Sequence, residues 1–577
     1  MAQRIKIRRD TAANWNQYNP ILSLGEQGYE TDTKQMKIGD GETAWNSLPY
    51  YRGFFTQALQ DKLNGIAANA QVNTIQTISV NGTNVAPNAQ KNVNIDLTKL
   101  NGIEAGAQVN KIETIKVNGI TQPITGKTVD LKIDNKSVVK LLGVRRKRTS
   151  NTNAAWERTD DAVGLVANAT KNGTAVQNDF DNIYPWSDIR SYMYNPTTKE
   201  RIADYGDPNF DFNTTQYEIM TEIPEFYYRR YVESDYEYVK ISNAPIDGFT
   251  KSPAFSVGRY ETSYDGTKVH SRSNTFPEVN RNITSFRTLS NALGEGIGQL
   301  DYRYCILQLL YLVEYANFNT QNILGKGCTY LRVNDADKAL VAESNTNRII
   351  VTAAVAGNFI VGQQISIGTS SAWNQAVAKD RTITAIADYS SGGVTGKAIT
   401  FDGAAVNIAV NNVIWSTGQK SGQLDSLGMK SGCLNNDGKH SVIYRGIENF
   451  FGNVYKFIDG INVKDHVAYV CYDPSQYVVD KFTAPYVAVG YTNANTNGWA
   501  KTLGYDEANP LMAFPTEVGA SDSTGTCDNY YQNTGNRIAL AGGHFHSTTN
   551  AGAWLWNLSN VSSYTNYSIG SRLLLNQ

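Results

Sequence analysis

The sequence has 577 residues, enough for about four domains of roughly 150 residues each, and its 52 Lys and Arg nearly balance its 53 Asp and Glu. Only 18% of residues are charged, and 48 Gly and 34 Tyr stand against 6 Met, which is typical of turn-rich β structure. Because no basic excess or long apolar stretch exists, we expect no nucleic-acid partner, no membrane insertion and no secretory signal.

Residues 1–52 are predicted to form a small β module. Ile5, Ile7, Met36 and Ile38 follow the alternation typical of strands, and glycines stand where hairpins must turn. The segment contains the motifs RRDTAANW, GEQGYETDT and KIGDGETAWNSLP. These motifs resemble the N-terminal module of phage tail fibres and of the major tropism determinant. The resemblance implies that this module attaches the chain to other phage tail or virion proteins.

Residues 53–149 contain an internal repeat. KLNGIAANAQVNTIQTISVNG begins at Lys62 and KLNGIEAGAQVNKIETIKVNG begins at Lys99, 37 residues later. Each copy is predicted to hold two strands joined by an Asn-Gly turn, and a unit this short must stack or associate to bury a core. The repeats resemble tail-fibre shafts, which are commonly trimeric, so the resemblance implies a β stalk in a homotrimer. A flexible linker is the alternative.

The basic run at residues 145–148 is predicted to be a solvated hinge between stalk and tip, since no basic or aromatic neighbours suggest a nucleic-acid patch. Residues 150–340 then become rich in rings and acids. Within them, residues 304–318 carry apolar side chains at helical spacing, with Glu314 expected on the wetter side. We interpret this segment as a helix that packs against the core.

Residues 341–417 are interpreted as an insertion. Five or six strand-like runs follow one another at intervals of about 10 residues, separated by Gly, Ser and Asn, and aromatic residues become scarce. This pattern predicts a small β sandwich or barrel placed in a surface loop, where insertions are tolerated. Two roles are left open for this domain, that of a spacer and that of an accessory binding module.

Residues 418–577 carry the most specific motifs of the tip. YRGIENFFGNVYKFIDGI and a closing GG followed by IGSRL, together with IPEFYYRRY and AFSVGRYE upstream, resemble the C-type lectin fold of the formylglycine-generating-enzyme type. The resemblance implies an α+β C-type lectin-like domain made of residues 150–340 and 418–577. Its motif positions are Asn449, Gly452, Asn453, Gly542, Gly543, Gly570 and Arg572. Glycines fit places where the backbone turns or approaches closely, and Arg572 is expected to form an internal pair or cap.

The sequence argues against an enzyme. The oxidases of that family hold copper with two closely spaced cysteines near the C-terminus, whereas Cys527 stands alone here. Tyr455-Lys456 replaces a Trp-Glu pair, which we interpret as a difference in surface detail. The five cysteines lie far apart, so neither a disulfide scaffold nor a zinc site is indicated. We therefore predict a binding scaffold with no catalytic residue and no cofactor, and a structural calcium ion is left open.

The last 34 residues interleave small residues with rings, hydroxyls and amides. Such endings resemble the target proteins of diversity-generating retroelements, in which Asn codons change at their adenines and exposed lectin-fold positions vary. Rings give contact area at low entropic cost, and Ser and Asn give adaptable hydrogen bonds. The predicted receptor-binding residues are His544, Phe545, His546, Ser547, Trp554, Leu555, Trp556, Ser559, Tyr564, Asn566, Tyr567 and Ser568.

Two alternatives apply to these residues. Trp554, Trp556 and Tyr564 could instead fill the core of the domain. His544 and His546 alternate as strand neighbours do, but no third ligand lies in reach for a metal site.

The leading hypothesis is a mainly β, multidomain phage tail fibre or receptor-binding protein of the virion, assembled in the host cytoplasm. Its N-terminus would attach to the particle, and its lectin-like tip would bind a glycan or protein receptor on the host cell. Two alternatives are a glycan-degrading tailspike, which would need paired carboxylates in a cleft, and a structural decoration protein.

Overall fold

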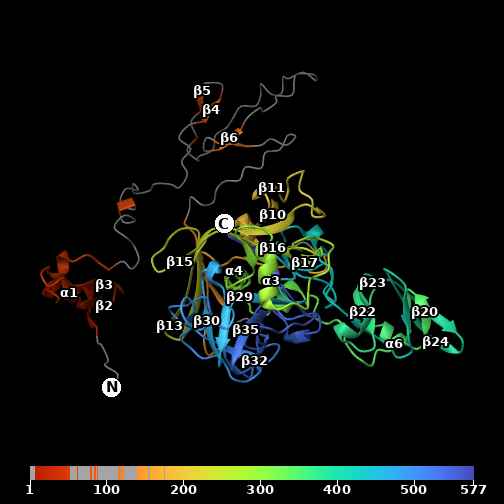
Figure 1. The fold of residues 1–577 in the computed structure, drawn as a ribbon. Helices are drawn as coiled ribbons and strands as arrows, with labels where there is room; N and C mark the ends of the chain where they lie inside the picture. The colour runs from red at the N-terminus through yellow and green to blue at the C-terminus, as the bar shows by residue number, and fades with distance from the viewer. Residues whose placement is uncertain are drawn as a thin grey trace. The chain divides into compact units, whose positions relative to one another are not determined.

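The computed structural model describes residues 7–51, 61–62, 78–80, 83–85, 88, 115–117, 120–122, 139–153, 156–174 and 176–576 (Figure 1). The chain divides into two compact units, Met1–Lys132 and Ile133–Gln577. Among the described residues strands outnumber helices in both units, which confirms the prediction of a mainly β, multidomain protein.

The N-terminal unit contains a three-stranded sheet and one short helix. Strand β1 pairs with β2 in parallel because α1 connects them, and β2 pairs with β3 in an antiparallel hairpin. The elements are β1 (Arg8–Asp10), α1 (Ala12–Tyr18), β2 (Gln27–Glu30) and β3 (Met36–Ile38). Thr11 caps α1 by accepting a hydrogen bond from the Asn14 backbone N–H at 3.3 Å.

The core of this module is a pair of tryptophans. The rings of Trp15 and Trp45 stack with centroids 4.1 Å apart, and both side chains are buried. Lys37 is also buried: its Nζ donates to the Trp45 carbonyl at 2.8 Å and lies 4.4 Å from the centre of the Tyr50 ring. A module of this size gains specificity from such contacts, because its apolar core is small.

The repeat predicted for residues 53–149 lies mainly outside the described residues, but both of its Asn-Gly turns are flanked by paired strands. In the first copy Val80 pairs with Thr83, and in the second Val117 pairs with Ile120, each in an antiparallel hairpin. The strands are β4 (Ile78–Val80), β5 (Thr83–Val85), β6 (Ile115–Val117) and β7 (Ile120–Gln122).

Three sheets build the C-terminal body, which we define as residues 139–340 and 418–576. The first is ordered β11 (Glu200–Asp204), β10 (Arg190–Asn195), β12 (Glu218–Ile223), β16 (Phe255–Glu261), β38 (Arg572–Asn576) and β19 (Ile297–Gln299). The second is ordered β15 (Thr250–Ser252), β13 (Phe226–Glu233), β14 (Tyr236–Ser242), β8 (Leu141–Lys147) and β9 (Glu157–Asp160).

The third sheet carries the C-terminal motifs. Its order is β31 (Val487–Ala488), β30 (Val467–Val470), β29 (Tyr455–Lys464), β35 (Asn536–Ala541), β36 (Trp556–Leu558), β34 (Asn529–Gln532), β32 (Gly498–Leu503) and β33 (Pro515–Val518), with β37 (Ile569–Gly570) beside β29. Two small hairpins are β17 (Ser263–Tyr264) with β18 (Val269–His270), and β27 (Ile443–Tyr444) with β28 (Ile447–Glu448). The helices of the body are α3 (Ile283–Asn291), α4 (Arg303–Tyr315) and α5 (Thr320–Leu324).

Helix α4 corrects one prediction. Every residue of this helix is buried, including Glu314, which the sequence pattern placed on a wetter side. The Glu314 carboxylate pairs with Arg445, whose guanidinium nitrogen lies 2.7 Å away, so the charge is compensated inside the core. Because the partner comes 131 residues later in the chain, helical spacing alone does not reveal it.

The predicted hinge at residues 145–148 is also wrong. These residues largely belong to β8, which pairs with β14 and β9 in the middle of the second sheet. The Arg146 side chain is only 3% exposed and pairs with the equally buried Glu237 at 3.2 Å. The body therefore starts before the boundary at residue 149 that the composition suggested.

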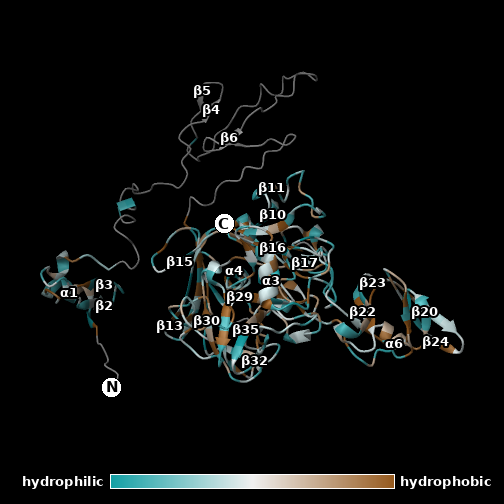
Figure 2. Cartoon of the chain, viewed as in Figure 1, coloured by the Kyte–Doolittle hydropathy of each residue, from teal (hydrophilic) through white to brown (hydrophobic). Residues whose placement is uncertain are grey.

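The inserted domain, residues 341–417, forms a separate lobe beside the body (Figure 1). It has its own apolar core, which includes Ile365, Ile399 and Phe401. Figure 2 shows hydrophobic residues along the strands of both parts. The main sheet is ordered β21 (Arg348–Val351), β24 (Val394–Phe401), β23 (Ala376–Ser391), β22 (Gln364–Gly368) and β26 (Val413–Ser416), and β20 (Glu343–Thr346), β25 (Val406–Ile408) and α6 (Ala353–Ala356) complete it.

None of the helices within the described ranges combines the length and the apolar character needed to cross a bilayer.

Candidate functional site

The segment 541–570 holds the predicted contact residues and connects three strands of one sheet. After β35 the backbone turns at Gly542 and Gly543, with φ values of 88° and 78°, and continues through a short 3-10 turn to β36. A longer loop, residues 559–568, then leads to β37. We call residues 559–568 the apical loop.

Between Gly543 and the apical loop, the aromatic side chains of Phe545, Trp554 and Trp556 and the side chain of Leu555 lie inside the body. Trp554 packs edge-on against Phe318 at 4.8 Å, and Trp556 packs edge-on against Phe514 at 4.8 Å. Leu555 and Phe545 are 0% and 1% exposed. The prediction that Phe545, Trp554, Leu555 and Trp556 contact a receptor is therefore wrong, because a side chain that fills the core cannot reach a partner.

Two of the predicted serines are buried as well. The Ser547 hydroxyl accepts a hydrogen bond from the His544 backbone N–H at 2.9 Å, and the Ser568 hydroxyl donates to the Asn566 side-chain oxygen at 2.8 Å. Both hydroxyls close local turns rather than face solvent. The contact role predicted for Ser547 and Ser568 is therefore replaced by a structural one.

The exposed part of the predicted set is the apical loop together with His546. The Tyr564 side chain is 38% exposed, Val561 is 42% exposed, and Ser559 and Asn566 are partly exposed. A hydrogen bond to another segment of the body restrains the loop: the Ser562 hydroxyl donates to the Asp480 carboxylate at 2.6 Å. Sequence reasoning missed Val561, because an isolated valine carries no signal that separates an exposed loop position from a core position.

Tyr567 lies at the junction with the inserted domain. Its ring is parallel to that of Trp373, with centroids 6.2 Å apart and an interplanar angle of 4°. The Asn566 carbonyl next to it accepts a hydrogen bond from the Asn280 backbone N–H at 3.0 Å. The end of the apical loop is thus fixed on both sides, and the presented residues lie between Ser559 and Thr565.

His544 is partly buried against the aromatic rings of Tyr455 and Phe545. Its ring centroid lies 5.2 Å from that of Tyr455, and burial lowers the pKa of His544 to about 3, with a smaller contribution from His546. His544 is therefore neutral at pH 7. The His544 backbone N–H donates to the Ser547 hydroxyl and its ring Nδ1 accepts from the His546 backbone N–H, so this histidine supports the turn after Gly543.

The lowered pKa of His544 predicts acid sensitivity of the C-terminal segment. An unfolded histidine has a pKa near about 6.5, so the unfolded chain binds more protons than the folded chain between that value and about 3. The stability contributed by neutral His544 is present above pH 6.5 and falls by up to about 1.4 kcal/mol per pH unit below it. The variant His544→Phe keeps the ring, so its melting temperature should fall less than that of the wild type between pH 7 and pH 4.5. Equal falls in the two proteins would contradict this assignment.

The residues of the first lectin-like motif form a buried polar network. The Glu261 carboxylate lies 2.8 Å from the Lys456 Nζ and accepts hydrogen bonds from the side-chain amides of Asn453 at 2.5 Å and Asn449 at 3.3 Å. Lys456 also donates to the Gly452 carbonyl at 2.7 Å. Burial lowers the pKa of Lys456 to about 8, and Glu261 opposes that effect. Lys456 is only 1% exposed, so interpreting it as a surface detail is wrong.

This network holds the two ends of the candidate site together. The Asn453 side-chain oxygen accepts from the Gln419 backbone N–H at 2.7 Å, where the chain leaves the inserted domain. The Asn453 carbonyl accepts from the Phe545 backbone N–H at 2.8 Å, at the start of the C-terminal segment. Asn449 and Asn453 both have positive φ, as does Gly452. Asn and Gly tolerate this left-handed backbone, so the residues form a tight local turn. Through Asn453 that turn is bonded both to the end of the inserted domain and to the start of the C-terminal segment.

Arg572 is an internal residue, 1% exposed, in the strand that ends the chain. Its guanidinium donates to the carbonyls of Gly258 at 2.7 Å and Arg259 at 2.8 Å, and to those of Glu448 and Asn449. Burial lowers the pKa of Arg572 to about 10. Gly570 lies so close to Val454 that a Cβ at position 570 would stand 2.9 Å from a methyl carbon of Val454. The motif that contains Gly570 and Arg572 therefore packs β38 tightly against the body.

Among the described residues no three His, Cys, Asp or Glu side chains converge as a metal site would require. The five cysteines are free and buried. Burial raises the pKa of Cys527 to about 12, so this thiol stays protonated at pH 7.

The fold and the site define a mainly β, multidomain protein that presents an exposed loop on a rigid body. Residues 5–43 match the family model of the Major tropism determinant N-terminal domain, which confirms the resemblance of the first module. No curated protein sequence matches the chain.

Two solved structures are similar to the chain at low levels. One is a Major Tropism Determinant U1 Variant, 11% identical, with 99% of each chain covered and a TM-score of 0.21. The other is a group A streptococcal phage-encoded tail-fibre showing hyaluronan lyase activity, 22% identical, with 30% of this chain and 62% of that chain covered and a TM-score of 0.08. At these TM-scores the superpositions do not establish a shared fold.

Proposed function

We propose that the chain is a bacteriophage receptor-binding tail-fibre protein and not an enzyme. The observation that carries the proposal is the match of residues 5–43 to the Major tropism determinant N-terminal domain. In this proposal residues 1–52 attach the chain to other tail proteins of the virion. The C-terminal body, taken as a C-type lectin-like domain, binds a glycan or protein receptor on the host cell.

The apical loop supports the binding half of the proposal. It combines a half-exposed ring at Tyr564, an exposed methyl pair at Val561 and several hydroxyls and amides. Aromatic side chains contribute large contact area at low entropic cost, and hydroxyls and amides adapt to different partners. A loop fixed at Asp480 and Trp373 is ordered before it binds, which reduces the entropy lost on binding.

The oligomeric state is part of the proposal. We propose a homotrimer formed through the repeats of residues 53–149, because a 37-residue unit cannot bury a sufficient core alone. Three tips on one stalk would raise weak single-site affinity by effective concentration. Variation of the apical loop by a retroelement is a further proposal, which a template copy beside the gene with Asn codons at Tyr564 and Tyr567 would support. We also propose that a structural calcium ion could be bound by the body.

Removal of residues 1–51 tests the attachment half. Particles produced with the truncated chain should lack it, because the module that joins the virion is gone, while the purified truncated chain should still sediment with susceptible cells. The variant Tyr18→Ala is the control, since this side chain is 73% exposed and lies outside the Trp15–Trp45 core. Normal amounts of the truncated chain on purified particles would contradict attachment through this module.

A further inference from the structure

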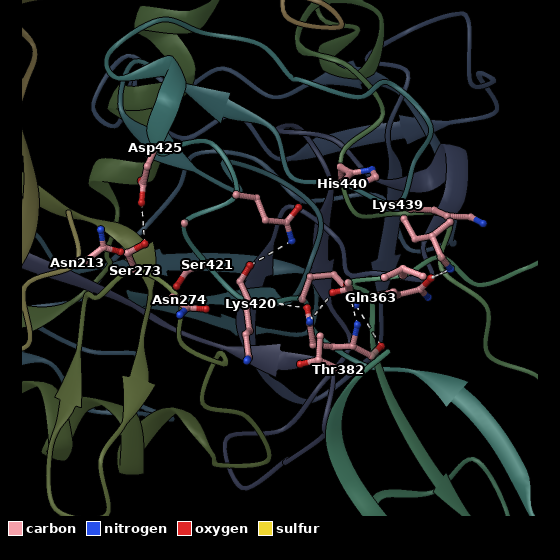
Figure 3. A pocket seen from close by; sticks show the side chains of 17 residues that line it. Asn213, Ser273, Asn274, Gln363, Thr382, Lys420, Ser421, Asp425, Lys439 and His440 are labelled. Carbon is pink, nitrogen blue, oxygen red and sulfur yellow. Dashed lines mark hydrogen bonds between the residues drawn. The ribbon is translucent and has the colours of Figure 1, made fainter. Parts of the chain in front are cut away.

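A polar cleft runs between the inserted domain and the body. One hollow, of about 650 Å³, is lined by loops of the inserted domain around Gln363 and by body residues near Ser421 (Figure 3). A second hollow, of about 670 Å³, lies between the segment 263–281 of the body, which includes β17 and β18, and Trp373 of the inserted domain. Each volume falls in the range of about 300–1,000 Å³ typical of ligand sites. Asn274 and Lys420 line both hollows, so the two join at these residues.

The base of the cleft is held rigidly by buried amides. The Gln364 backbone N–H donates to the Gln419 side-chain oxygen at 3.0 Å, and the Lys420 backbone N–H donates to the Gln364 side-chain oxygen at 2.8 Å. Gln419 is in turn bonded to Asn453 of the body network. Because these amides are buried and mutually bonded, the inserted domain cannot pivot at this point without breaking several hydrogen bonds. The cleft is therefore formed before a ligand arrives.

The side chains of Asn274 and Lys420, at the junction of the hollows, have donors left for a ligand. Within the described residues the Asn274 side-chain amide forms no hydrogen bond, and this residue is exposed. The Lys420 Nζ forms no ion pair there and lies 4.8 Å from the centre of the Phe276 ring. An unbonded amide and an ammonium group thus line both hollows, and each can contact a ligand that spans them.

The first hollow is positive in charge. Among the described residues that line it, Asp425 is the one carboxylate, and it is already bonded to Arg259 at 3.3 Å and to the Ser273 hydroxyl at 2.6 Å. Lys420 and Lys439 line the same hollow without ion pairs. The amides that are at least partly exposed in this hollow belong to Asn213, Asn274 and Gln423. Those of Gln363, Gln364 and Gln419 are buried and form its base.

We infer that this cleft binds an acidic oligosaccharide. Amides and hydroxyls donate and accept hydrogen bonds together, which suits a ligand made of hydroxyl groups. The two joined hollows suit a ligand of several repeated units. The lysines of the first hollow suit a carboxylate or phosphate group at that end, whereas the second hollow has the carboxylates of Asp265, Glu278 and Asp380 beside Arg272 and Arg281 and suits a unit without a charge. A nucleic acid would need a longer run of cations, and an apolar peptide would need apolar pockets. The inference does not rest on the proposed role of the apical loop.

A microarray of bacterial capsular polysaccharides and O-antigens, probed with the labelled full chain, tests this inference. We expect binding to glycans that carry uronic acid or phosphate groups, and a signal at least tenfold lower for the double variant Asn274→Gly, Lys420→Met. Glycine keeps the positive φ of 56° at position 274, and methionine keeps most of the length of lysine, so the fold should be unchanged. Equal melting temperatures of variant and wild type verify that.

The matched control is the double variant Asn411→Gly, Lys430→Met. Asn411 also has a positive φ, of 69°, and both side chains are exposed and lie outside the cleft. Its array signals should equal those of the wild type. Absence of any bound glycan, binding to neutral glycans alone, or unchanged signals in the cleft variant would overturn the inference. None of these results bears on adsorption through the apical loop.

Discussion

Replacing Glu261 by Gln should destabilise the C-terminal body by about 3–5 kcal/mol, because a buried lysine then loses its counter-charge. Glu261 Oε1 lies 2.8 Å from Lys456 Nζ, and both side chains are at most 4% exposed. Glutamine keeps the shape of the side chain but cannot neutralise the ammonium group. Since a large domain shifts by about 2–4 °C per kcal/mol, the melting temperature should fall by roughly 6–20 °C.

A double-mutant cycle separates this pair from general disruption. Lys456→Met alone should also be strongly destabilising, because it leaves the Glu261 carboxylate buried without a cation. The double variant Glu261→Gln, Lys456→Met should cost at least about 2 kcal/mol less than the sum of the two single variants. Lys464→Met, at the exposed end of the same strand β29, is the control and should stay within about 0.5 kcal/mol of the wild type. Additive effects, or a loss under about 1 kcal/mol for Glu261→Gln, would refute the role of the network.

The second large effect concerns binding. Substituting Tyr564 and Val561 together by alanine and serine should lower the affinity of the purified chain for susceptible cells by at least about 30-fold. Tyrosines that anchor an interface typically contribute about 2 kcal/mol or more, and both side chains are exposed at the tip of a loop that the body holds in place. Binding of fluorescent protein to whole cells measures the change.

The melting temperature should stay unchanged in this variant, because neither side chain belongs to a core cluster of the body. Tyr18→Ala serves as the control in the other unit, since it also removes an exposed tyrosine. If cell binding survives the loss of Tyr564 and Val561 and that of Tyr18 equally well, the apical loop is not the contact surface.

The local patterns of the sequence predicted the short-range structure best. The Asn-Gly turns correctly predicted the hairpins at Val80–Thr83 and Val117–Ile120, because two-residue turns of this kind depend on the turn residues themselves. The motifs of the first 52 residues predicted a family that a match to residues 5–43 bears out. The helix of residues 304–318 was also predicted, within a few residues of α4.

The predictions failed where long-range partners decide the environment. Arg146, Glu314 and Lys456 were placed at the surface because isolated charges are usually solvated. Each is buried beside an opposite charge that lies 91, 131 or 195 residues away in the chain. No spacing rule connects such pairs. The prediction that Trp554 and Trp556 contact a receptor failed for a related reason, because an aromatic residue serves equally well in a core or in a contact surface.

The sequence also could not predict the cleft beside the inserted domain. Its walls come from residues near 274, 363 and 421, which meet only after the inserted domain folds back on the body. The composition of the insertion predicted its strands but not the surface that it forms with its neighbour. Sites of this kind become visible only when the fold is known.

Competition for adsorption tests the central claim most directly. Susceptible cells are saturated with the purified full chain, washed and mixed with the phage that carries it, and the adsorption rate constant is measured. If the chain is the receptor-binding protein, the rate should fall at least tenfold, and the Tyr564→Ala, Val561→Ser variant should not reduce it at the same concentration. An adsorption rate that the saturating wild-type chain leaves unchanged would contradict a receptor-binding role.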